Sequence, residues 1–147
     1  MQFERYEIKA SSSSLQFNFY STGPKGKIKK QVIFKAFKDN PKVFNIGFGD
    51  VDESGDINDL TVTDNKDSQK ILATVAFAIS IFLEKRPGFY VYATGSTKAR
   101  SRLYRMGIAN NLGNILQNFT VFAFTNNVWE PFEKGKDYDE FLIGLKK

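Results

Sequence analysis

The spacing of the apolar residues changes near Asp67, and this change restricts the chain to a fold that contains both strands and helices. Upstream, Leu15, Phe17 and Phe19 alternate with polar residues, as on a strand that buries one face. Downstream, the apolar residues between positions 71 and 83 recur at helical spacing. The pattern therefore predicts the α+β class.

The order of the segments predicts an N-terminal β meander followed by an αβαβ section, in a mainly antiparallel sheet with two main helices. A turn at 22–26 should join the first two strands into a hairpin. We expect strands at 15–20, 27–37, 44–48, 57–62, 89–94, 119–124 and 141–145, a buried helix at 67–85 and a half-exposed helix at 97–117. The length of 147 residues predicts one domain over 1–147.

The chain contains no Cys and no His. Their absence excludes disulfides, thiolate nucleophiles, triads with His, His acid–base catalysis and the usual zinc sites. The longest apolar run is about 13 residues, too short to cross a bilayer. The charged start, MQFERYEIKA, lacks the apolar core of a signal peptide, so a cytoplasmic location and no membrane partner are expected.

The sequence YVYATGSTKARSRLYRMGI predicts a strand that runs into Gly95 and then a cationic helix. A helix that begins after Gly-Ser-Thr directs unpaired N–H groups outward, and these groups favour an anion. The loop is not a Walker motif, because the Gly-Lys-Ser/Thr ending is absent. The expected anion-binding residues are Gly95, Ser96, Thr97, Lys98, Arg100, Arg102 and Arg105.

Charged residues are segregated along the chain. Residues 25–42 hold seven Lys against one acidic residue, and residues 50–67, the acidic block, hold seven Asp or Glu against one Lys. The expected basic surface is formed by Lys25, Lys27, Lys29 and Lys30. This surface could contact nucleic acid or only guard a strand edge. Likewise, the cations of the helix at 97–117 could bind an anion, pair with the acidic block or be solvated.

Within the acidic block, the segment DVDESGDI resembles the opening of an EF-hand calcium loop. However, the twelfth position is Thr61 rather than a bidentate carboxylate, so a hairpin turn of turn-forming residues is favoured. Asp50, Asp52 and Asp56 are weak metal candidates at most. Accordingly, no metal or cofactor is expected.

Several segments resemble an uncharacterised family of small bacterial proteins, classed as a domain of unknown function. These segments are STGPKGKIKK at 21–30, FNIGFGD at 44–50, DSQKILATVAFAISIF at 67–82 and GSTKARSRLYRMGI at 95–108. The resemblance covers nearly the whole chain and implies no activity. The order of elements and LYRMGI at 103–108 also resemble the acyl-CoA N-acetyltransferase fold. Residues 63–68 lack the glycines of that family's pyrophosphate loop, so an enzyme of this kind would be degenerate.

These observations favour a non-enzymatic protein that binds a phosphate group of RNA, DNA or a nucleotide, in a bacterial regulatory or defence system. One alternative is a metal-dependent nuclease or phosphodiesterase that uses the acidic block. Another is a degenerate acetyltransferase-like fold that acts as a protein-interaction module. A purely protein-binding role would use Trp129 and Phe132 near the C-terminus.

Overall fold

The computed structural model describes residues 4–55, 57–58, 65–95 and 97–146. The described residues form nine strands and three helices. The strand pairing is mostly antiparallel, and β4 pairs with β6 in parallel. The fold is therefore α+β, as the apolar spacing predicts. Its contacts group into two compact units, the hairpin unit (Gln2–Lys35 with Ile46–Phe82) and the α2 unit (Ala36–Asn45 with Leu83–Lys147). The expectation of a single domain over 1–147 stays a prediction.

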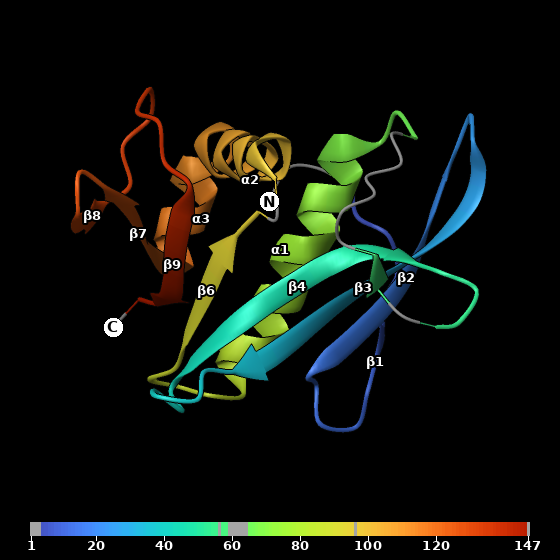
Figure 1. Ribbon diagram of the computed structural model, residues 1–147, viewed down its shortest axis with the longest axis horizontal. Helices are drawn as coiled ribbons and strands as arrows, with labels where there is room; N and C mark the ends of the chain where they lie inside the picture. Colours follow the sequence, from blue (N-terminus) through green and yellow to red (C-terminus); the bar gives the residue numbers. More distant parts are fainter. Residues whose placement is uncertain (1–3, 56, 59–64, 96, 147) are drawn as a thin grey trace. The chain divides into compact units, whose positions relative to one another are not determined.

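The hairpin unit is built around a long antiparallel hairpin. Strand order in this unit is β1-β2-β3-β4, and β5 pairs with β4 (Figure 1). The strands are β1 (Lys9–Ala10), β2 (Gln16–Gly23), β3 (Gly26–Ala36), β4 (Val43–Val51) and β5 (Ile57–Asn58). The turn between β2 and β3 contains Pro24 and Lys25, with Gly26 at a positive φ of 89°, so the predicted turn at 22–26 is confirmed. The short strand β1 has no counterpart in the sequence-based prediction.

Helix α1 (Ser68–Glu84) covers the inward face of this hairpin. Phe17 and Phe19 of β2 point inward with Val32 and Phe34 of β3, as the alternation requires. The rings of Phe34 and Phe82 stack with centroids 4.3 Å apart, which fixes α1 against β3. The predicted buried helix at 67–85 is therefore confirmed.

In the α2 unit, the strand order is β6-β9-β7-β8, and residues 43–45 of β4 pair with β6 in parallel. The elements are β6 (Tyr90–Thr94), α2 (Lys98–Asn110), α3 (Leu112–Asn118), β7 (Phe119–Thr125), β8 (Val128–Pro131) and β9 (Glu140–Leu145). Figure 1 shows α3 beside β7, to which it leads directly. Neither β8 nor the parallel pair is evident from the apolar spacing.

The single helix predicted at 97–117 is wrong, because the chain breaks it at Asn111. The side chain of Asn111 donates to the carbonyl of Gly107 (2.8 Å), and its backbone N–H donates to Ile108 O (3.2 Å). The residue has φ −120° and ends α2 while it begins α3. An Asn side chain that bonds the preceding turn offers the backbone an alternative to a continuous helix.

Candidate functional site

Side chains of α2 and its N-cap bind the backbone N–H groups at the start of the helix. Thr97 is the N-cap, with extended backbone (φ −134°), and its hydroxyl accepts a hydrogen bond from Arg100 N at 3.2 Å. The N–H of Gly95 donates to Ser101 Oγ at 2.9 Å. Two backbone N–H donors that could have faced an anion, those of Gly95 and Arg100, therefore already have partners inside the connection between β6 and α2, which we call the joint.

The predicted anion-binding residues are not gathered on one surface. Arg100 is only 3% exposed and lies in the interior. Arg105 forms an ion pair with Asp137, which lies outside the acidic block. Lys98 and Arg102 are exposed. Ser96 lies outside the described residues. The joint thus presents Thr97, Lys98 and Arg102 to solvent, with Arg105 already neutralised.

Position 95 needs glycine because there is no room for a side chain, and not because the backbone is left-handed there. A Cβ built on Gly95 would lie 2.3 Å from Ser101 N and 2.7 Å from the backbone carbon of Arg100. We predict that Gly95→Ala lowers the free energy of unfolding by about 1–3 kcal/mol, the usual cost of forced overpacking. Urea denaturation measures this loss.

The matched control is Gly113→Ala in α3, where a Cβ meets nothing within 4 Å. This change should stabilise the protein by about 0.5–1 kcal/mol, because Ala is the better helix former. Equal effects at Gly95 and Gly113 would show that the joint is not closely packed.

The acidic block does not assemble a metal site among the residues that the structure describes. Asp50 forms an ion pair with Lys30. Asp52 Oδ1 accepts hydrogen bonds from the N–H and the hydroxyl of Ser54 (3.0 and 2.6 Å), and Gly55 follows at φ 89°. Asp56 lies outside the described residues. The interpretation of residues 52–55 as a turn is confirmed.

The lysines of β3 lie on opposite faces of the β2–β3 hairpin. Lys27 and Lys29 are exposed on the outer face, whereas Lys30 points inward and is only 2% exposed. The prediction that Lys30 belongs to the basic surface is therefore wrong. Successive side chains on a strand point to opposite faces, so Lys30 shares the inward side with Val32 and pairs with Asp50.

On the outer face, an aromatic ring lies among the lysines. Tyr20 is 45% exposed and lies directly opposite Lys29, while Thr22 lies opposite Lys27. The ammonium of Lys27 is 4.4 Å from the centroid of the Tyr20 ring, a cation–π contact. We call Tyr20, Thr22, Lys27 and Lys29 the Lys–Tyr face. No Asp or Glu occurs between Glu7 and Asp39, although this stretch contains seven Lys.

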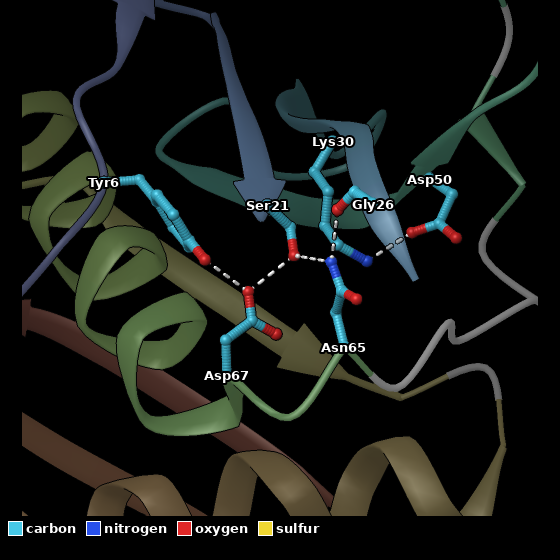
Figure 2. Close-up of polar contacts among 7 residues, drawn as sticks. All are labelled: Tyr6, Ser21, Gly26, Lys30, Asp50, Asn65 and Asp67. Atoms are coloured by element: carbon cyan, nitrogen blue, oxygen red, sulfur yellow. Dashed lines mark hydrogen bonds and ion pairs between the residues drawn. The ribbon is translucent and has the colours of Figure 1, made fainter. Parts of the chain in front are cut away.

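The inner side of the same hairpin end is held by the side chain of Asn65, which is 1% exposed (Figure 2). Its Oδ1 accepts from Lys25 N (2.7 Å), and its Nδ2 donates to Gly26 O (2.9 Å) and Ser21 Oγ (3.1 Å). A Cβ at Gly23 would lie 2.2 Å from the carbonyl oxygen of Asn65, so glycine leaves the room that this contact needs. Asn65 thereby fixes the turn that joins β2 to β3.

Asp67 extends this buried polar cluster. Its Oδ2 accepts from the hydroxyls of Ser21 (2.5 Å) and Tyr6 (2.6 Å). The Tyr6 oxygen in turn accepts from Thr22 N at 3.0 Å. Figure 2 shows Ser21 between Asp67 and Asn65. Because Ser21 is fully buried, a substrate cannot reach its hydroxyl, and its bonds to Asp67 and Asn65 support the hairpin.

Local sequence patterns do not reveal this cluster. Its members lie far apart in the chain, since Ser21 is 46 positions from Asp67 and Tyr6 is 61 positions from it. The sequence does contain one signal for the cluster, because Ser21 follows Phe17 and Phe19 on the inward side of the strand. A hydroxyl at such an inward position requires a buried partner.

Two aromatic residues near the C-terminus, Trp129 and Phe132, differ in their exposure to solvent. Trp129 is 42% exposed and contacts the rings of Tyr92 and Phe124, whereas Phe132 is buried. Burial, reinforced by its hydrogen bond to the Glu140 carboxylate, raises the pKa of Tyr92. Of the two residues predicted for protein binding, only Trp129 is exposed.

No helix within the described ranges is long and apolar enough to cross a membrane. No curated protein and no solved structure is significantly similar to the chain. The model of a family of unknown function, DUF6934, matches residues 2–146. The chain therefore belongs to this family, which confirms the resemblance to a domain of unknown function.

Proposed function

We propose that this member of DUF6934 binds nucleic acid and that the Lys–Tyr face is the surface that contacts it. The observation that carries the proposal is the arrangement of the hairpin's outer face, where exposed lysines flank an exposed aromatic ring and no acidic residue is present on either strand. A polyanion with flat bases fits this chemistry, because lysines neutralise phosphates and an aromatic ring stacks on bases.

The rigidity of the hairpin supports the same proposal. Asn65 and Asp67 hold the inner side of the hairpin through four hydrogen bonds, so the lysine backbones are already ordered before a ligand arrives. A preordered surface loses less conformational entropy when it binds. The Lys27–Tyr20 contact restrains two of the side chains in addition.

The start of α2 is a second candidate contact for a phosphate, either of nucleic acid or of a nucleotide. Its support is the pair of exposed cations, Lys98 and Arg102, beside a helix start capped by Thr97. An Arg102→Ala variant that loses affinity for a nucleotide would favour this contact. The nuclease alternative has less support, since Asp50 is paired with Lys30, and Mg²⁺-dependent cleavage of the bound strand would revive it.

We predict that Lys27→Ala/Lys29→Ala binds a labelled single-stranded oligonucleotide about tenfold more weakly than the parent, a change of about 1.4 kcal/mol. The reason is the loss of two cations from the contact surface, and fluorescence anisotropy at fixed salt measures it. Both lysines are exposed, so the fold should persist.

The charge-matched control is Lys38→Ala/Lys134→Ala, which removes two exposed cations from other segments. Its affinity should stay close to that of the parent. Equal losses in the two double variants would mean that net charge alone drives binding, and unchanged affinity in Lys27→Ala/Lys29→Ala would rule out the Lys–Tyr face.

A further inference from the structure

We infer, on the basis of the proposed function, that the ligand is a single strand and that one of its bases stacks on the ring of Tyr20. The ring is 45% exposed, although a Tyr on a strand can bury its apolar part against neighbours. A base would stack on the exposed part of the ring that the Lys27 ammonium does not cover, within reach of the cations that would hold phosphates.

The geometry favours a single strand over a duplex. In a duplex the faces of the bases are covered by their neighbours, so a ring that stands on a strand can contact only edges and backbone. In a single strand the bases are free to leave the stack and cover an aromatic side chain. The position of Tyr20 directly opposite Lys29, with Lys27 against its ring, matches a nucleotide unit in which base and phosphate are adjacent.

The competing interpretation is that Tyr20 only strengthens the hairpin through its contact with Lys27. That role would also place the ammonium 4.4 Å from the ring centroid. It predicts no dependence of binding on the bases of the ligand. A comparison of ligands with and without bases therefore separates the two interpretations.

The experiment measures the affinities of the parent, Tyr20→Leu and Tyr20→Phe for three ligands of equal length: single-stranded oligothymidine, an abasic single strand and a duplex. The parent should bind oligothymidine about tenfold more tightly than the abasic strand or the duplex, because stacking requires accessible bases. Tyr20→Leu should lose this preference, so that its affinity for oligothymidine falls to about its affinity for the abasic strand. Tyr20→Phe, which keeps the ring, should retain the preference.

Two results would overturn the inference while the proposed function stands: Tyr20→Leu that keeps the preference of the parent, or an equal loss on the abasic strand and on oligothymidine. In either case Lys27→Ala/Lys29→Ala would still bind all three ligands more weakly. A parent that binds none of the three would instead overturn the proposed function itself. Cooperative urea unfolding of Tyr20→Leu establishes that the variant is folded.

Discussion

Lys30→Met should lower the free energy of unfolding by about 3–5 kcal/mol, the cost of breaking a buried ion pair. The Lys30 side chain is 2% exposed and that of Asp50 is 14% exposed, so the substitution removes the Lys30 ammonium from a largely buried carboxylate. The neighbouring change, Lys29→Met, affects an exposed side chain and should shift the free energy by less than about 0.5 kcal/mol. Urea denaturation at neutral pH compares the two.

Adding Asp50→Leu to Lys30→Met should recover much of the loss, because apolar partners of similar size often replace a buried pair without a net cost. If Lys29→Met proved as destabilising as Lys30→Met, the hairpin register would be shifted by one residue, since such a shift exchanges the two faces. The Lys–Tyr face would then not exist.

Asn65→Ala should lower the free energy of unfolding by about 2–4 kcal/mol, because it leaves several buried polar groups without partners. The lost bonds are those to Lys25 N, Gly26 O and Ser21 Oγ. Asn65→Asp should be similarly costly, because it replaces the Nδ2 donor with an oxygen that faces the carbonyl of Gly26. Hydrogen exchange at Lys25 N should also become faster in both variants.

Asn110→Ala supplies the control for this change, since Asn110 is exposed near the end of α2. It should alter stability by no more than about 0.5 kcal/mol. If Asn65→Ala had an equally small effect, Asn65 would not hold the hairpin turn.

The sequence predicted the fold class because its signals are local. Alternation identified β2 and β3, and helical spacing identified α1. The parallel pairing of β4 with β6 joins segments more than forty residues apart, and local spacing carries no information about such a partner. The short strands β1 and β8 are made by pairing with β2 and β7 rather than by their own periodicity.

The same distinction applies to the candidate sites. Alternation along β3 was sufficient to separate Lys30 from Lys29, but charge counting placed both in one surface. At about 100° per residue, Lys98, Arg102 and Arg105 share one side of α2. Arg100 falls on the opposite side, in agreement with its interior position. The partner of Arg105, Asp137, is distant in sequence and could not be inferred from periodicity.

The salt dependence of binding tests the central claim most directly. If the Lys–Tyr face neutralises phosphates, the logarithm of the affinity for single-stranded oligothymidine should fall linearly with the logarithm of salt concentration. The slope of Lys27→Ala/Lys29→Ala should be shallower than that of the parent by about 1.4, which is about 0.7 for each lost phosphate contact. Lys38→Ala/Lys134→Ala should keep the parent's slope. A parent affinity independent of salt, or the parent's slope in Lys27→Ala/Lys29→Ala, would contradict binding of nucleic acid through this face.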